Sequence, residues 1–319
     1  MLGRSLVCAM LALSPTLARA HGEHPTGRPQ GYTPPRSLDI LSKAKAAARI
    51  EIDRASGARL IRTDGLPDHS TGSFPGPGNP NAIAPQSYTL RVPLEPQRTG
   101  SILPSRVQPW GIALNGVLFD PGTAEFWNND PRGGWIMEAI GGPRNLGLDH
   151  NNAHVQPDGT YHYHGILNGL MNRLALRDAP TLLGYAADGF PVYGPFGYAR
   201  AADPASGIKK LAPSYRLKSG ERGPGEPPGR HNGHYARDFD YVAGLGDLDE
   251  CNGREGPTPE YPQGTYHYVL TETFPFIPRC FVGEPDPSFN IKRPPGGGRG
   301  GPPGGGPPGG RPPPPPGRF

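Results

Sequence analysis

Short stretches in which apolar and polar residues alternate run through most of the chain, separated by Gly- and Pro-rich segments. Residues 88–94 alternate in this way, and residues 50–53 and 60–63 flank the turn-like Ala55-Ser56-Gly57. Residues 111–119 carry Asn115-Gly116 between two apolar runs, which is the strongest short-range signal for a hairpin. The pattern therefore predicts strands joined by tight turns.

The rest of the chain also favours strands over helices. Residues 135–140 and 266–271 read as strands, the first of them buried, and residues 182–198 are apolar but interrupted by Gly and Pro. A helix is expected only at residues 38–48, and residues 216–233 form a polar insertion. We predict a mainly β fold with antiparallel strands, long ordered loops and little helix, in a single main domain.

Composition supports the same fold class. The 319 residues include 48 Gly and 44 Pro, and because both are poor helix formers, a coiled coil and a helical bundle are excluded. Part of the excess lies in residues 294–319, which cannot build a core. We predict a mobile N-terminal segment at residues 21–48, a domain at residues 49–287 and a disordered Gly/Pro-rich tail at residues 288–319.

Residues 1–20 have the layout of a secretory signal peptide. Arg4 precedes a short apolar stretch, and Ala18 and Ala20 supply the small-x-small cleavage pattern. Because this stretch is too short to span a bilayer, we expect an exported protein, periplasmic or extracellular, without an integral membrane segment. The formal net charge is +4, with no basic stripe and no known nucleic-acid motif, so no nucleic acid is expected as a partner.

Cysteine usage fits an exported protein. Cys8 lies in the signal segment, which leaves Cys251 and Cys280. Two thiols in an oxidising compartment most often form one disulfide. A metal site ligated by these cysteines is the weaker alternative.

A seven-residue segment occurs twice in the chain. Residues 158–164 read DGTYHYH and residues 263–269 read QGTYHYV. On a strand, His162 and His164 share one face and the two tyrosines share the other, and His267 likewise faces away from its flanking tyrosines. If the two strands lie side by side, three imidazoles share one surface.

Such a surface is suited to a transition metal, because copper and zinc favour imidazole ligands. His154, just upstream of the first copy, or His69 would complete the site. We therefore expect copper or zinc on a set drawn from five candidate ligands, namely His162, His164, His267, His154 and His69. The alternative is a hydrogen-bonded Tyr/His cluster that holds no metal.

Acidic residues suggest further roles. Asp188 or Glu250 would orient a ligand imidazole, or act as a general base if an open coordination position holds water. Asp247, Asp249 and Glu250 also offer oxygen ligands for calcium, which is less favoured than copper or zinc.

These residues and several longer segments resemble the YHYH domain family, named for the motif at residues 161–164. The resemblance covers residues 50–284 and implies a mostly secreted or envelope-associated protein, but it implies no particular reaction. The family-like segments are GLPDHSTG at residues 65–72, GNPN at 78–81, NGVLFDPGTAE at 115–125, GYAADGFPVYG at 184–194 and LDECNG at 248–253.

The leading hypothesis is thus an exported metal-binding protein, with zinc-assisted hydrolysis and copper redox chemistry as two activities. The tyrosines beside the ligands favour copper slightly. The runner-up is a non-enzymatic binding module of the cell envelope, in which the Tyr/His surface binds a glycan or a protein. A copper site at a mature N-terminus beginning with His21, near His24, is a weaker alternative.

Overall fold

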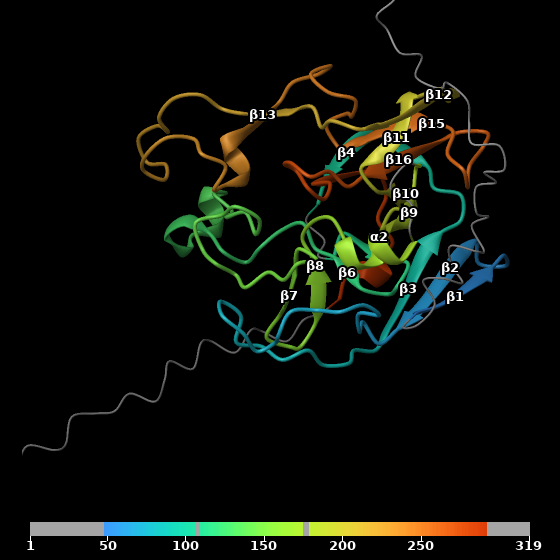
Figure 1. The fold of residues 1–319 in the computed structure, drawn as a ribbon, viewed down its shortest axis with the longest axis horizontal. Coiled ribbons are helices and arrows are strands. Elements are labelled where there is room, and N and C mark those ends of the chain that lie inside the picture. The colour runs from blue at the N-terminus through green and yellow to red at the C-terminus, as the bar shows by residue number, and fades with distance from the viewer. Residues whose placement is uncertain (1–47, 106–108, 175–178, 292–319) are drawn as a thin grey trace, which may run out of the picture. The chain divides into compact units, whose positions relative to one another are not determined.

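The computed structural model describes residues 48–105, 109–174 and 179–291 (Figure 1). The predicted signal peptide, the N-terminal segment, most of the expected helix at residues 38–48, and the Gly/Pro-rich tail beyond residue 291 lie outside the described residues. Within them, the chain forms seventeen strands and a single α-helix, which confirms the mainly β fold. No helix among these residues is long and apolar enough to cross a membrane.

The first described elements form a three-stranded antiparallel sheet of β1 (Ala48–Asp53), β2 (Ala58–Thr63) and β3 (Tyr88–Pro93). The Asp53 carboxylate closes the β1–β2 turn by accepting hydrogen bonds from the backbone N–H groups of Ala55 and Ser56. The predicted hairpin and the strand at residues 88–94 are therefore confirmed.

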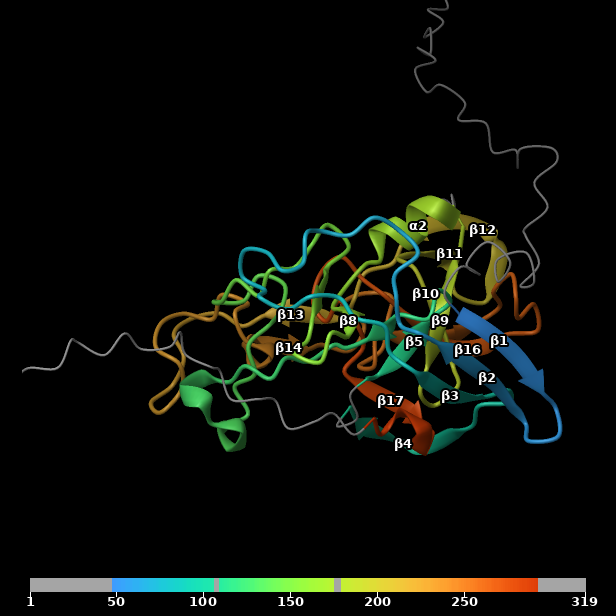
Figure 2. The same ribbon diagram turned by 90° about the horizontal axis from the view of Figure 1, so that it is seen from below.

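An eight-stranded sheet forms the centre of the fold (Figures 1 and 2). It is mixed: β6 and β8 run parallel, as do β10 and β16, and the other neighbours are antiparallel. The strands follow the order β15 (Gly253–Gly256), β16 (Thr265–Val269), β10 (Pro191–Tyr193), β9 (Leu182–Ala186), β5 (Gly111–Ala113), β6 (Leu118–Phe119), β8 (Tyr161–Tyr163) and β7 (Ala153–Val155).

This sheet consists of two halves related by a pseudo-two-fold axis. Its centre is the antiparallel pair β5–β9, where Ile112 lies opposite Tyr185. From there each half continues with a hairpin partner, then a parallel Tyr-His-Tyr strand, and finally that strand's antiparallel partner at the edge. The two copies of the repeated segment thus occupy β8 and β16, with four strands between them.

The turns of the two halves match as well. Asn115-Gly116 joins β5 to β6, and Asp188-Gly189 joins β9 to β10, with φ of 85° and 95° at the two glycines. In each turn the glycine N–H donates to the carbonyl three residues earlier, at 2.9 Å and 3.0 Å. Only glycine adopts such φ values without strain. The hairpin predicted at residues 111–119 is confirmed.

The smaller elements surround this sheet, and β4 and β17 form a separate two-stranded ribbon (Figure 2). Cys280 on β17 forms a disulfide with Cys251, as predicted. The remaining elements are β4 (Arg98–Pro104), α2 (Asn168–Leu174), β11 (Phe196–Arg200), β12 (Asp203–Lys210), β13 (Tyr215–Leu217), β14 (Phe239–Tyr241), β17 (Cys280–Gly283), and the 3-10 turns η1 (Trp127–Asn129), η2 (Pro131–Gly133), η3 (Ala236–Asp238) and η4 (Pro287–Phe289).

The sequence predicts a buried strand at residues 135–140 and a polar insertion at residues 216–233. Residues 135–140 form no strand: Ile136 and Met137 make only isolated β-bridges, to Phe126 and Tyr235. The run is apolar, yet it has no continuous neighbouring strand to pair with. The polar insertion at residues 216–233 is anchored by Arg222, whose Nε and Nη2 lie 2.7 and 2.6 Å from the two oxygens of the buried Asp238 carboxylate.

Candidate metal centre

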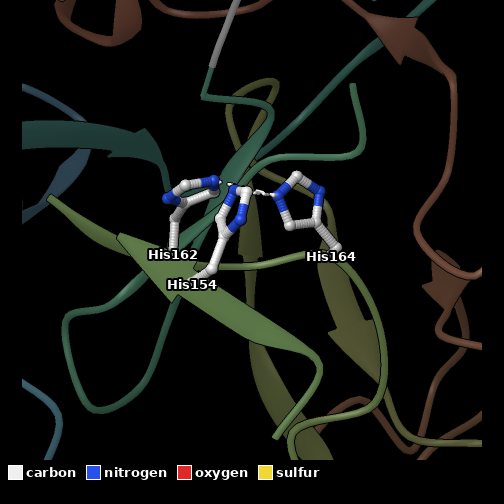
Figure 3. A group of neighbouring side chains, drawn as sticks. All are labelled: His154, His162 and His164. Atoms are coloured by element: carbon white, nitrogen blue, oxygen red, sulfur yellow. Dashed lines mark hydrogen bonds between the residues drawn. The ribbon is translucent and has the colours of Figure 1, made fainter. Parts of the chain in front are cut away.

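Three imidazoles meet on one face of the β7–β8 pair. His154 on β7 lies directly opposite His162 on β8, and His164 follows at the end of β8. The Nε2 atom of His164 lies 2.9 Å from Nε2 of His162 and 3.1 Å from Nε2 of His154 (Figure 3). Strand alternation explains this placement, because residues two apart project from the same face. We call these three residues the imidazole cluster.

Backbone carbonyls set the tautomers of two rings in the cluster. Nδ1 of His154 lies 2.8 Å from the Leu146 carbonyl, and Nδ1 of His162 lies 3.2 Å from the Thr160 carbonyl. Since a carbonyl only accepts, each Nδ1 carries the proton, and each Nε2 is left with a lone pair. Both lone pairs therefore face Nε2 of His164.

The imidazole cluster is buried, and this burial favours the neutral form of His154. His162 and His164 are 1% and 3% exposed, while His154 is partly buried. Burial lowers the pKa of His154 below its usual value, because removing water disfavours the charged ring. Neutral imidazole is the form that binds a metal ion.

The donor spacing fits a transition metal. Zn–N bonds are about 2.0–2.1 Å, so tetrahedral ligand nitrogens lie about 3.3–3.4 Å apart. The two short Nε2–Nε2 distances are 2.9 and 3.1 Å, and the donor atoms of all three residues lie within 4.8 Å of one another. Two of the three separations are thus within a few tenths of an ångström of the tetrahedral value. Three protein ligands also leave one coordination position open.

A carboxylate that the sequence analysis missed lies on the same face of the central sheet as the cluster. Asp120 is 1% exposed, and its N–H donates to the Tyr163 carbonyl, which extends the parallel β6–β8 ladder by one residue. Because Leu118 lies opposite His162, alternation puts Asp120 on the same face as His162 and His164. Its Oδ2 accepts from Nε2 of Gln156 at 3.2 Å. Its place in the family-like segment at residues 115–125 was the signal that the sequence offered.

His69 lies on the opposite face of β8. Its Nδ1 faces the Ser70 carbonyl at 3.0 Å, so its Nε2 accepts from the Tyr163 hydroxyl at 2.5 Å. Asn115 also donates to that hydroxyl, at 3.0 Å. The Tyr161 hydroxyl donates to Asp149. The structure therefore separates His69 from the imidazole cluster and places it among the tyrosines, which confirms the predicted two faces of the strand.

His267 is not part of the cluster, because β10, β9, β5 and β6 separate its strand from β8. The two repeat strands are not neighbours, so the condition under which His267 would share a surface with His162 and His164 is not met. The Nδ1 atom of His267 donates to the Thr265 carbonyl at 3.2 Å. Burial, together with the positive charge of Arg254, lowers the pKa of His267 to about 4.

The structure brings neither proposed catalytic acid to the imidazoles. Asp188 accepts from the Tyr268 hydroxyl at 2.6 Å and from the Gly283 N–H at 3.1 Å, and burial raises its pKa to about 6. The side chain of Glu250 is exposed.

The carboxylates considered for calcium take part in structural contacts. Asp247 binds Lys209 and the Ala212 N–H, while Asp249 accepts from two N–H groups of its own loop and from a tyrosine hydroxyl. Among the described residues, the imidazole cluster is the one group of three or more such side chains placed to share an ion.

Comparison with known proteins agrees with the motif at the centre of the site. Neither the curated proteins nor the solved structures contain a match to the chain. The model of one protein family, described as YHYH protein, matches residues 89–283, which is more than half of the chain and includes both halves of the central sheet. This chain therefore belongs to the YHYH protein family.

Proposed function

We propose that this protein binds one transition-metal ion through the Nε2 atoms of His154, His162 and His164. The observation that carries the proposal is the pair of backbone carbonyls that hold protons on Nδ1 of His154 and His162. Two lone pairs then face the third Nε2, at 2.9 and 3.1 Å. One N–H on His164 would have to be shared between two acceptors, whereas a cation accepts all three lone pairs.

Zinc is the ion we favour, and copper is the alternative. Three imidazoles with one open position are the ligand set of a catalytic zinc site. Blue-copper centres need a cysteine thiolate, and Cys251 and Cys280 are held in a disulfide. The tyrosines that favoured copper lie on the other face of β8, so that argument no longer applies.

Asp120 would supply the negative charge that the site needs. Three neutral rings leave a divalent ion uncompensated in a buried place, which is costly. A carboxylate on the same face lowers this cost, and it can accept a proton from water in the open position. Hydrolysis assisted by the metal is the activity we infer, with Asp120 rather than Asp188 or Glu250 as the base.

The envelope-module alternative lacks support from the geometry. It requires tyrosine rings that can stack on a glycan, but Tyr161 and Tyr163 are only 1% and 0% exposed. Export itself remains part of the proposal, and the disulfide supports it because such bonds persist in oxidising compartments.

Metal content measured by mass spectrometry tests the proposal. We expect close to one zinc per chain in the wild type purified with zinc and copper supplied, and none in His162→Ala/His164→Ala. The matched control is His267→Ala, which removes a buried ring with the same Nδ1–carbonyl bond from the other half of the sheet. Wild type without metal, or equal loading of all three proteins, would contradict a site at the cluster.

A further inference from the structure

The second half of the central sheet contains a counterpart of the metal centre in which the ligands are replaced. Arg254 lies opposite His267 on β15–β16, just as His154 lies opposite His162 on β7–β8. The strand registers further match Val269 to His164 and Tyr193 to Asp120. One imidazole thus remains beside a permanent cation, which excludes a metal ion from this place.

Arg254 is an unusual residue for the interior of a sheet. It is 9% exposed, and its Nε atom is buried without a hydrogen-bond partner. Within the described part of the chain, no carboxylate forms an ion pair with it. A buried charge without a partner is costly, so such groups normally bind an opposite charge.

The surroundings of Arg254 do not neutralise it. Burial lowers the pKa of Arg254, and the negative charge of Asp247 offsets this effect only in part. The two oxygens of that carboxylate bind Lys209 Nζ, at 2.5 Å, and the Ala212 N–H, at 2.9 Å. His267 is neutral near pH 7, since its pKa is lowered to about 4. The cation therefore has no counterion of its own.

Glycine makes room for the guanidinium. A Cβ atom at Gly197 on β11 would lie 2.5 Å from Nη2 of Arg254 and 2.7 Å from the Leu211 side chain. Any larger residue at this position would displace the guanidinium. The local structure thus holds the cation in place against the backbone of β11.

We propose that Arg254 is the binding group of a second site, which takes a small oxyanion such as a carboxylate or a phosphate. Guanidinium donors match both groups through paired, charge-assisted hydrogen bonds. The small exposed fraction of the residue is where an ion from solvent reaches the side chain. Because four strands separate this place from the imidazole cluster, the site does not depend on the proposed metal site.

Thermal unfolding and calorimetric titration with phosphate, acetate and chloride test the proposal. We expect phosphate or acetate, but not chloride at equal ionic strength, to raise the Tm of the wild type. The anion that raises the Tm more, phosphate or acetate, identifies the chemical class of the ligand. Arg254→Met, which keeps the length of the stem, should weaken binding about tenfold or more, as expected when a charge-assisted pair is lost. His162→Ala/His164→Ala should bind the oxyanion as the wild type does.

Three results would overturn the proposal. Equal responses of wild type and Arg254→Met would mean adventitious surface binding, and no response of the wild type would mean a purely structural arginine. If Arg254→Met does not fold, Arg254→Lys replaces it, because it retains the charge but loses the paired donors. Undiminished binding by Arg254→Lys would then contradict the site.

Discussion

His162 on β8 and His267 on β16 occupy equivalent positions in the two halves of the central sheet. Each ring donates from Nδ1 to the carbonyl two residues earlier, at 3.2 Å in both cases. Each lies opposite the second residue of its antiparallel partner strand, which is His154 for one ring and Arg254 for the other. The same backbone therefore presents the same imidazole twice, and the neighbouring side chains decide which chemistry each copy supports.

Replacing His164 by the residue at the equivalent position of the second half should strongly weaken metal binding. His164→Val removes the nitrogen that lies 2.9 and 3.1 Å from the other two, and the two remaining imidazoles hold zinc far more weakly. Competition with a zinc chelator would measure the affinity, which we expect to fall by more than about 100-fold. Unchanged affinity would show that the ion lies elsewhere.

The reverse replacement should create a second metal site. Arg254→His/Val269→His gives His267 the two neighbours that His162 has, on strands with the same register. We expect the zinc content to rise from one to two ions per chain, measured by mass spectrometry on the purified variant. A folded variant that still binds one ion would show that backbone register alone does not position the donors.

Asp120→Asn should weaken metal binding without removing it. The amide keeps the size of the side chain but loses the charge that offsets the ion. Changes to groups that support a metal ligand cost about 10–100-fold in affinity. The matched control is Asp158→Asn, an acid in the turn between β7 and β8, whose Oδ1 accepts from the Thr160 N–H. Equal zinc affinity of both variants would exclude a role for Asp120.

His267 should make the fold sensitive to acid. Its pKa is lowered from 6.5 to about 4, so the unfolded chain binds a proton that the folded chain does not take up between these values. Stability is therefore complete above about pH 6.5 and is lost as the pH falls towards 4. At pH 4, this proton should cost the wild type up to about 3 kcal/mol of its free energy of unfolding. His267→Gln should not show this cost.

Urea unfolding at pH 4, 5 and 7 would measure this difference. Asp188 acts in the opposite direction, because its pKa is raised from 3.8 to about 6 and stability falls as the pH rises through this range. Asp188 is present in both proteins, so its contribution cancels when they are compared. Parallel pH profiles of wild type and His267→Gln would contradict the prediction.

The disulfide should contribute a large part of the stability. Cys251 and Cys280 are 29 residues apart, and closing a loop of this size is worth about 3–4 kcal/mol in the chain-entropy model. We expect Cys251→Ala/Cys280→Ala to lose that amount in denaturant unfolding. The loss should be the same with and without zinc, because the disulfide joins the loop before β15 to β17, and β15 lies at the opposite edge of the central sheet from β7. A zinc-dependent loss would indicate coupling between the halves.

The sequence by itself determined the local features of this protein. Alternation along residues 158–164 was enough to separate His162 and His164 from the tyrosines, because the direction of a side chain on a strand depends only on its position in that strand. Asn115-Gly116 identified its hairpin for the same reason, since the turn is a property of two residues. The disulfide followed from there being two cysteines after the predicted signal peptide.

Only the tertiary structure decided which strands are neighbours. Similarity between two segments does not bring them together, and here a pseudo-two-fold axis places β8 and β16 in opposite halves. Parallel pairing of β6 with β8 brought Asp120 to the imidazoles across a long connection, and His69 was held on the tyrosine face. Hydrogen bonds between distant strands depend on packing of the whole sheet, so no local pattern predicts them.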